Sequence, residues 1–176
     1  MSFLRTIVSS SLLVAWTTNA WGSSAGFDGS WKSVQEELTK SIGCEWIGTE
    51  LEAECPLYAM RGNIELRRVS PAGELDTIEI NPVIIGHRVG PSVEEYGRKV
   101  ALSVLKLVVP KWQNGPNWLR SALNSARKPG TRTVTKVGNV SILVLHLQPA
   151  DIPDTYADVV ITTRASLKDW DDVDPR

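Results

Sequence analysis

Hydrophobic residues near the start of the chain recur with the period of a helix. Four of them share one helical face: Trp31, Val34, Leu38 and Ile42. A spacing of three or four residues is typical of an amphipathic helix that packs its apolar side on the rest of the protein. Ser30 and Gly43 are residue types that commonly cap the two ends of a helix. We therefore expect a helix that begins after Ser30 and ends at Gly43.

Two further helices are predicted in the middle of the chain. One opens with the sequence Ser92-Val93-Glu94-Glu95, which is typical of a capping box, and runs to Val109, where Pro110 follows. Its second half, VALSVLKLVV, is apolar on nearly all sides, so we expect this helix to be buried across a sheet. A shorter helix is expected at about Pro116 to Arg127, with apolar residues on one face.

Alternating apolar and polar positions predict β-hairpins. The segment NIELRRVSPAGELDTIEI (63–80) reads as two strands joined by a turn at 70–73. The segment TRTVTKVGNVSILVLHL (131–147) reads as another hairpin, with Gly138 and Asn139 as its two-residue turn. Its second strand is apolar on both faces, so we expect it to lie centrally in a sheet.

These elements define one α+β domain. A further strand is expected at 156–163, and a hairpin around the cysteines brings the total to three hairpins plus a C-terminal strand. We predict an antiparallel sheet of about six or seven strands, covered on one face by helices. The domain spans 26–166, and 167–176 form an acidic tail. The composition, with 42% hydrophobic and 22% charged residues, is that of an ordinary globular protein.

The first residues have the layout of a secretory signal peptide. Positions 1–5 carry one basic residue, the apolar stretch TIVSSSLLVAW follows, and TTNAWGSSA is small and polar. The apolar stretch is too short to span a membrane. We expect a signal peptide over 1–22, with cleavage after Ala20, Gly22 or Ala25, and a secreted or periplasmic protein with no membrane span. An uncleaved anchor, or a first helix of the fold, is the alternative.

Cys44 and Cys55, with ten residues between them, are the two cysteines of the chain. A redox pair would need the spacing C-x-x-C, and a zinc site would need further Cys or His residues nearby. In an exported chain the two cysteines most simply form one disulfide. A hairpin centred on 49–50 places Cys44 opposite Cys55, and Trp46 opposite Ala53. Closing this loop is expected to stabilise the protein by about 3 kcal/mol.

Charge is distributed unevenly along the chain. Positions 96–150 contain nine basic residues and no acidic one, whereas 26–95 contain 13 acidic and 6 basic residues. The segment 151–176 is again acidic, and the net charge of the whole chain is only −1. Two interpretations stay open. The basic helices pair with the acidic strands inside the protein, or the basic segment forms a surface that binds a partner.

The second interpretation makes the shorter helix and its flanks the candidate binding surface. Its residues are Lys111, Trp112, Arg120, Arg127 and Lys128. Arg120 and Arg127 are seven positions apart and share a helix face, and Trp112 is expected to be exposed while Trp118 packs inward. Aromatic and cationic side chains together suit an acidic protein or an anionic envelope glycan. Export makes nucleic acid the least favoured partner.

The sequence carries no familiar catalytic signature. It lacks a G-x-S-x-G elbow, an H-E-x-x-H zinc motif and a P-loop. Of its two histidines, His146 lies on an apolar strand and is interpreted as a hydrogen-bonded core residue. His87 lies in a loop between Gly86 and Gly90 and is the better candidate for catalysis. No metal site and no cofactor is predicted.

We therefore expect an exported, periplasmic, non-catalytic binding protein that docks an acidic partner through its basic helical face. An inhibitor, an immunity factor or an envelope accessory protein would fit this description. One alternative is a small exported hydrolase that uses His87. Another is a small-ligand carrier with a groove between helix and sheet, which is less favoured because the apolar helix around 100–109 fills that space.

Overall fold

The computed structural model describes residues 30–60, 62–68, 70, 74–85, 91–147 and 155–163. The predicted signal peptide at 1–22, the loop that contains His87 and the acidic tail at 167–176 lie outside these ranges.

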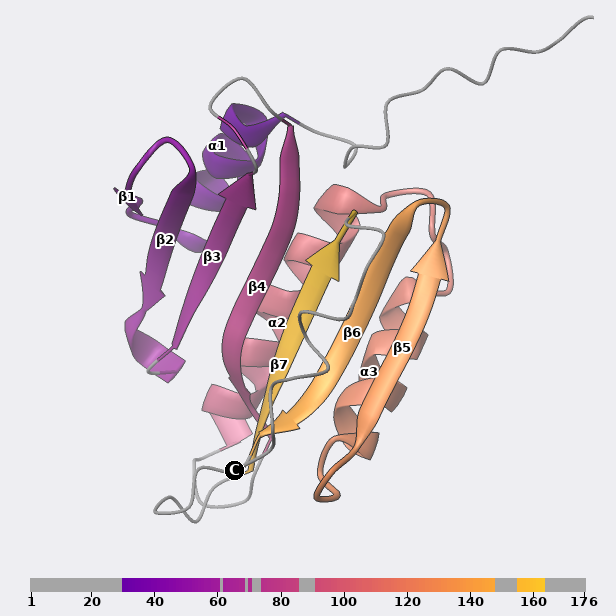
Figure 1. The fold of residues 1–176 in the computed structure, drawn as a ribbon. Coiled ribbons are helices and arrows are strands. Elements are labelled where there is room, and N and C mark those ends of the chain that lie inside the picture. The colour runs from indigo at the N-terminus through magenta and orange to yellow at the C-terminus, as the bar shows by residue number, and fades with distance from the viewer. Residues whose placement is uncertain are drawn as a thin grey trace, which may run out of the picture.

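Seven antiparallel strands form one sheet in the order β1-β2-β3-β4-β7-β6-β5 (Figure 1). Their bounds are Ile47–Gly48 (β1), Glu52–Leu57 (β2), Gly62–Arg68 (β3), Leu75–Ile84 (β4), Arg132–Val137 (β5), Val140–Leu147 (β6) and Tyr156–Thr162 (β7). A short 3-10 helix, η1 (Tyr58–Met60), connects β2 to β3. The predicted α+β class, with three hairpins plus a C-terminal strand, is confirmed.

In the described part of the chain, three helices cover one face of this sheet (Figure 1). They are α1 (Trp31–Ile42), α2 (Pro91–Val108) and α3 (Gly115–Ser125). The middle helix, α2, packs on β4 and contacts α1 on one side and α3 on the other. Its buried residues include Val100, Val104 and Leu105, which join the sheet residues Ile78 and Ile80 in one hydrophobic core. The predicted burial of this helix across the sheet is confirmed.

The caps predicted for α1 are present, whereas the one predicted for α2 is not. The Ser30 side chain accepts a hydrogen bond from the backbone N–H of Ser33, and Gly43 ends α1 in the left-handed conformation. The predicted capping box of α2 is wrong, because the helix already begins at Pro91 and Ser92 lies inside its first turn. Proline suits the first helical position, because its φ angle is fixed near the helical value and its missing N–H has no helical partner to lose.

The turn of the first hairpin lies one residue later in the chain than the sequence predicted. Gly48 lies opposite Ala53, where the sequence predicted Trp46. Thr49 closes the turn, since its backbone N–H donates to the Glu52 carbonyl at 2.7 Å. Its hydroxyl also accepts from the backbone N–H of Glu52 at 3.2 Å. These bonds fix a turn over 49–52 rather than one centred on 49–50.

The predicted disulfide between Cys44 and Cys55 is confirmed, with Cα atoms 5.4 Å apart. Cys44 follows Gly43 directly and precedes β1, so it is not part of the hairpin ladder. Both cysteines are buried in the core. The disulfide therefore joins the end of α1 to β2, rather than two opposite positions of one hairpin.

The third hairpin turns as predicted, with Val137 opposite Val140 and Gly138 at a positive φ of 62°. Its second strand, β6, is flanked by β5 and β7 and is therefore interior. The central position of the sheet, however, belongs to β4. Leu143 on β6 lies opposite Val160 on β7, on the sheet face away from the helices. Both side chains are fully buried, which agrees with a strand that is apolar on both faces.

Candidate functional site

The five predicted binding residues lie along α3 and its two flanks. Lys111 and Trp112 are in the connection between α2 and α3, Arg120 is within α3, and Arg127 and Lys128 follow its end. Lys111, Arg120 and Lys128 are exposed, whereas Trp112 and Arg127 are half-buried. Because α3 has 11 residues, its two ends are about 16 Å apart. The structure thus brings Lys111 next to Trp112 and separates this pair from Arg127 and Lys128.

Arg127 makes an internal ion pair. Its Nη2 atom lies 2.6 Å from Oε1 of Glu94, which also accepts from Nη2 of Arg98 at 2.7 Å. Glu94 is in the first turn of α2, so this cluster ties the end of α3 to the beginning of α2. The cations paired on α2 and at the end of α3, within the described residues, contact Glu94 and Glu95 on α2 and not the acidic strands.

Trp112 packs against the start of α3 and is not the exposed residue that the sequence predicted. Its ring lies 5.6 Å from that of Trp118, between centroids, and both side chains are half-buried against the core. Gly115 makes room for this packing, since a Cβ atom there would lie 2.8 Å from the Trp112 ring. The indole is therefore held in place by its neighbours, with part of its surface exposed.

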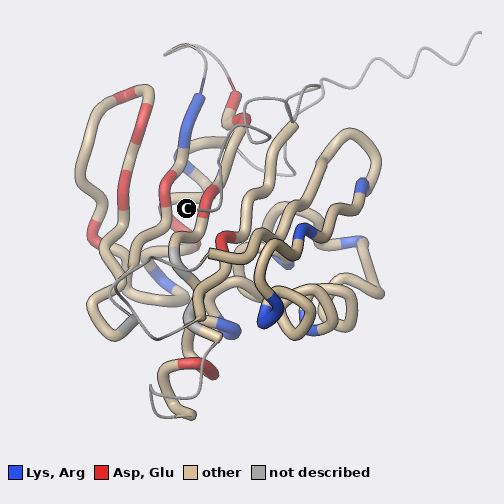
Figure 2. Tube along the Cα trace, turned by 60° about the horizontal axis from the view of Figure 1, so that its bottom comes forward, with Lys and Arg blue, Asp and Glu red and all other residues tan. Residues whose placement is uncertain are grey.

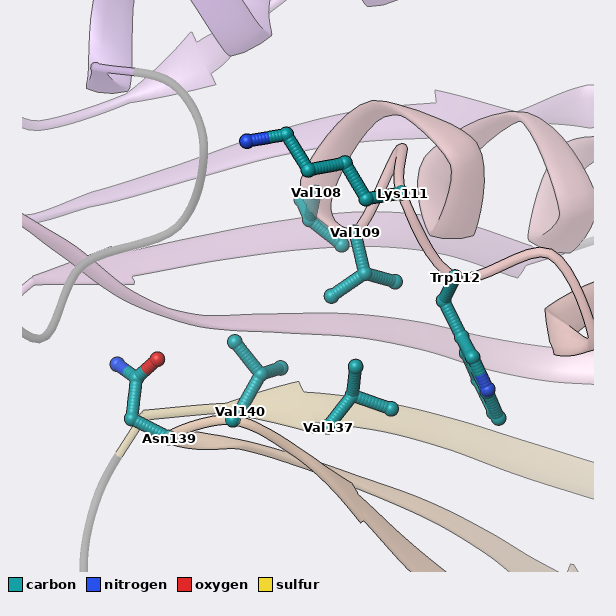
Figure 3. Close-up of a pocket in the computed structure, with 8 residues that line it drawn as sticks. Val108, Val109, Lys111, Trp112, Val137, Asn139 and Val140 are labelled. Atoms are coloured by element: carbon teal, nitrogen blue, oxygen red, sulfur yellow. The ribbon is translucent and has the colours of Figure 1, made fainter.

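A pocket of about 280 Å³ lies between the end of α2 and the β5–β6 turn. Its lining residues are Val108, Val109, Lys111, Trp112, Val137, Gly138, Asn139 and Val140. In Figure 3, Val109 faces Val137 and Val140 across the opening, and Trp112 closes one end. The exposed Lys111 and Asn139 side chains lie at its margin. Such a pocket suits an apolar group attached to an anionic one.

The opposite face of the sheet, which we call the outer face, carries acidic side chains on its first strands. Figure 2 marks the acidic positions along the chain. The register places Glu54 opposite Glu65 and Glu65 opposite Glu79, on β2, β3 and β4. We call Glu54, Glu65 and Glu79 the carboxylate row. The next positions across the sheet are apolar, with Val160 on β7 followed by Leu143 on β6.

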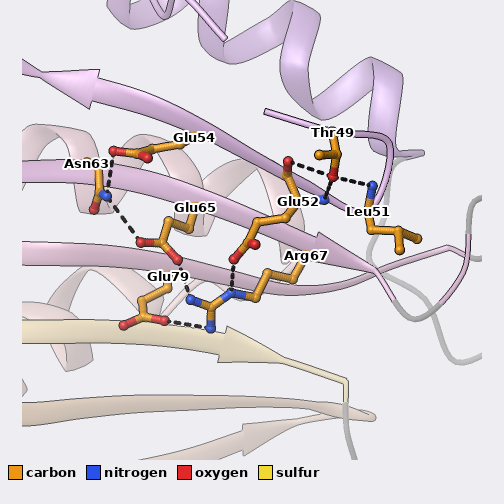
Figure 4. Close-up of polar contacts among 8 residues, drawn as sticks. All are labelled: Thr49, Leu51, Glu52, Glu54, Asn63, Glu65, Arg67 and Glu79. Carbon is orange, nitrogen blue, oxygen red and sulfur yellow. Dashed lines mark hydrogen bonds and ion pairs between the residues drawn. The ribbon is translucent and has the colours of Figure 1, made fainter. Parts of the chain in front are cut away.

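Two side chains of β3 bind the carboxylate row (Figure 4). Arg67 contacts Glu65, its Nη1 lies 3.2 Å from Oε2 of Glu79, and its Nε lies 3.0 Å from Oε1 of Glu52. The Asn63 amide donates to Glu54 at 2.9 Å and to Glu65 at 3.1 Å. Burial raises the pKa of Glu79 above its ordinary value, and the attraction of Arg67 only partly offsets this.

Asp158 on β7 lies on the same face of the sheet, two residues before Val160. It is only 6% exposed, and its Oδ1 atom is buried without a hydrogen-bond partner. Burial, followed by repulsion from Glu79 and Glu65, raises the pKa of this carboxyl to about 8. Sequence patterns gave no sign of this residue, because it lies in an apolar strand that is distant along the chain from the other carboxylates.

His146 lies on the helix side of the sheet and is 5% exposed. Its Nδ1–H donates to the carbonyl of Ala126 at 2.6 Å, at the end of α3, while Nε2 is buried without a partner. The interpretation of His146 as a hydrogen-bonded core residue is therefore confirmed. His87, the other histidine, lies outside the described residues.

In the part of the chain that the structure describes, no helix is long and apolar enough to cross a membrane. The same residues contain no group of three Cys, His, Asp or Glu side chains that could hold a metal ion. Comparisons of the chain with protein-family models, with curated proteins and with solved structures find no match.

Proposed function

We propose that this protein is an exported, non-catalytic binding protein that docks an acidic protein partner at the α2–α3 connection. The observation that carries the proposal is the pocket between Trp112 and the β5–β6 turn, with Lys111 at its margin. An apolar side chain of the partner would enter this pocket, and a neighbouring carboxylate would pair with Lys111. An inhibitor, an immunity factor or an envelope accessory protein would act in this way.

Charge supports the same surface. Lys111, Arg120 and Lys128 are exposed, and no ion pair to them occurs among the described residues. Exposed cations of this kind increase the rate at which an acidic partner is encountered. A half-buried aromatic ring such as Trp112 acts later, because binding energy at an interface concentrates in well-packed aromatic and Arg residues.

Export is part of the proposal and is supported by the disulfide. A bond between Cys44 and Cys55 forms and persists in an oxidising compartment such as the periplasm or the exterior of the cell. The amino-terminal sequence at 1–22, with its basic start and apolar centre, gives the second support.

The test is capture of a partner from an envelope extract, followed by binding kinetics with the purified partner. The double variant Lys111→Glu/Arg120→Glu should slow association at least tenfold and weaken its dependence on salt. Trp112→Ala should mainly speed dissociation, by tenfold or more. The matched control is Lys32→Glu/Lys40→Glu on α1, which changes the net charge by the same amount. Equal slowing in the control would contradict a site at α3.

A small ligand is the second candidate occupant of the pocket. The volume of about 280 Å³ is close to the lower end of the range for small-molecule sites. An apolar dye with one anionic group, such as a naphthalene sulfonate, tests this idea by fluorescence. Binding of the dye that Trp112→Ala abolishes, with no protein partner captured, would favour the small-ligand function.

A further inference from the structure

Strand β5 forms one edge of the sheet and, among the described strands, pairs with β6 alone (Figure 1). Its six residues pair with β6 in one continuous register, and they contain no Gly and no Pro. The other edge strand, β1, has two residues, of which Gly48 has a positive φ of 124°. A short, irregular edge discourages the addition of another strand, whereas a longer regular one accepts it. The edge that suits a further strand is therefore β5.

Backbone groups at alternate residues of β5 point away from β6. The two-residue turn makes Val137 and Val140 a hydrogen-bonded pair, and at the other end the His146 N–H donates to the Thr131 carbonyl at 2.9 Å. In an antiparallel pair, such positions alternate with positions whose N–H and C=O face outward. The N–H and C=O groups of residues 132, 134 and 136 therefore face the edge of the sheet.

The side chains of the same three residues lie on the outer face, because Val134 lies opposite Leu143. Arg132, Val134 and Lys136 are all exposed, Val134 by 44%. In an antiparallel pair of two β5 strands centred on Val134, Arg132 of one copy would lie opposite Lys136 of the other. Like charges at directly opposite positions destabilise a sheet, and Lys on an edge strand discourages self-association. The two cations instead favour a strand with acidic side chains opposite them.

We propose that the acidic partner adds an extended segment to β5 as a further antiparallel strand of the sheet. This inference rests on the proposed function, and it names the form in which the partner is recognised. The added strand would exchange main-chain hydrogen bonds with residues 132, 134 and 136. Its side chains opposite Arg132, Val134 and Lys136 would be acidic, apolar and acidic, as in the pattern Glu-x-Val-x-Glu. Main-chain bonds supply affinity in this mode of binding, and alternate side chains supply specificity.

The β5 edge ends at the pocket beside Trp112. Val137, the last residue of β5, lines this pocket together with Lys111 and Asn139. A strand added along β5 would therefore end beside the opening. The apolar side chain that we propose for the pocket would then lie just beyond the paired residues, in the same segment of the partner.

The test is titration of the isotope-labelled full chain with the peptide Thr-Glu-Thr-Val-Thr-Glu-Thr, followed by nuclear magnetic resonance. The amide signals of Val134 and Lys136 should shift, with a Kd of about 1 mM or tighter. The same peptide with Lys in place of Glu should bind at least about tenfold more weakly. N-methylation of the Val and Glu residues of the peptide should abolish binding, because their N–H groups face β5. N-methylation of the two Thr residues beside Val is the matched control and should preserve binding.

Val134→Pro tests the same contact from the side of the protein. The Val134 N–H faces the edge, so proline removes a donor to the added strand but none to β6, and the fold should persist. Affinity for the peptide should fall at least about tenfold, whereas Val134→Ala, which keeps the N–H, should lose only about twofold. Lys136→Glu should reverse the preference, so that the Lys peptide binds more tightly than the Glu peptide. If Val134→Pro unfolds the chain, Lys136→Glu decides.

The outcomes separate this inference from the proposed function. Absence of shifts at Val134 and Lys136, or equal affinity for the Glu and Lys peptides, overturns the strand addition. A dimer of the chain that Val134→Pro dissociates, measured by sedimentation, would assign the edge to a second copy and also overturns it. A captured partner that is weakened by Trp112→Ala but not by Val134→Pro would preserve the docking function and overturn the strand addition. Binding of the peptide at β5, with a captured partner that is unaffected by Trp112→Ala, would support the strand addition and contradict the pocket.

Discussion

The acidic half of the molecule, at β2, β3 and β4, and the basic half, around α3, carry opposite charge in different surroundings. On the outer face of β2, β3 and β4, carboxylates lie on adjacent strands, partly buried, and share Arg67. Around α3, the cations Lys111, Arg120 and Lys128 lie far apart and exposed. Figure 2 shows this separation of acidic and basic segments in space. A nearly neutral chain thus presents two charged surfaces.

The spacing of the strands explains why like charges repel each other more strongly in the acidic half than around α3. Neighbouring strands are about 4.8 Å apart, so charges on opposite positions interact strongly, and burial weakens the screening by water. Cations spread along a helix surface and its flanks are screened by solvent and salt. The acidic half should therefore respond strongly to changes in charge or pH, and the basic half should respond mainly in its binding.

Among the substitutions, the largest expected effect on stability comes from removing the disulfide that joins α1 to β2 in the acidic half. The double variant Cys44→Ser/Cys55→Ser should lower the free energy of unfolding by about 3 kcal/mol, because the unfolded chain then gains the conformational entropy that the disulfide removes. Urea denaturation measures this loss. The pocket near Trp112 is distant from the disulfide, so partner binding per folded molecule should be unchanged. An unaltered denaturation midpoint would show that packing alone holds α1 on the sheet.

Local patterns in the sequence were sufficient for most of the fold. The helical period at 31–42, the turn at Gly138 and Asn139, and the pairing of Cys44 with Cys55 depend on residues close together in the chain. The alternation around Glu65 and Glu79 in one hairpin also places both side chains on one face, so part of the carboxylate row could have been found. The turn at 49–52 depends on the Thr49 hydroxyl, which alternation does not encode.

The surroundings of Asp158 and the pocket at Trp112 both depend on contacts between segments that are distant along the chain. Asp158 meets Glu79 because β7 pairs with β4, across a long crossover that contains both α2 and α3. Trp112 meets Val137 because the end of α2 lies over the β5–β6 turn. No periodicity predicts either contact. The basic residues of α3 were predicted as a group, whereas the binding of Arg127 to Glu94 became visible only in three dimensions.

In the basic half, a hydrogen bond from His146 links β6 to the end of α3. His146→Ala should lower the free energy of unfolding by about 2 to 3 kcal/mol, because it leaves a cavity and removes the donor to the Ala126 carbonyl. Thermal denaturation followed by circular dichroism measures this effect. The companion variant His87→Ala should leave the melting temperature nearly unchanged. If His87→Ala instead abolished a hydrolytic activity of the folded protein, the hydrolase alternative would replace the binding function.

The free energy of unfolding should depend on pH through Asp158, which lies in the acidic half. The pKa of Asp158 is about 8 in the folded protein, whereas its ordinary value is 3.8. Between these two pH values the folded protein keeps the Asp158 proton, and the unfolded chain has lost it. The free energy of unfolding should therefore fall as the pH rises from about 4 to about 8, by up to about 1.4 kcal/mol per pH unit for this one carboxyl.

Urea denaturation at several pH values gives the slope. Glu65 and Glu79 are the charged groups that repel the Asp158 carboxyl. On the neighbouring strand β6, the outer-face residues Ser141, Leu143 and Leu145 do not titrate, so they add nothing to the slope. Asp158→Asn should flatten the slope. The same slope in both proteins would assign the pH dependence to other groups.

The smallest expected effect separates the cations of α3 that serve the fold from those free to bind. Arg127 and Glu94 are each about a third exposed or less, so their ion pair is expected to contribute about 0.5 to 1 kcal/mol, after screening by solvent. Arg120 is exposed and should contribute a few tenths at most. A double-mutant cycle with Glu94→Gln measures the difference, because it isolates the coupling of each Arg to the carboxylate. Coupling for Arg127→Gln and none for Arg120→Gln would show that the basic segment is divided between internal pairing and an open surface. Coupling of similar size for both would mean that the whole segment pairs within the protein, and the proposed docking of an acidic partner at α3 would lose its electrostatic basis.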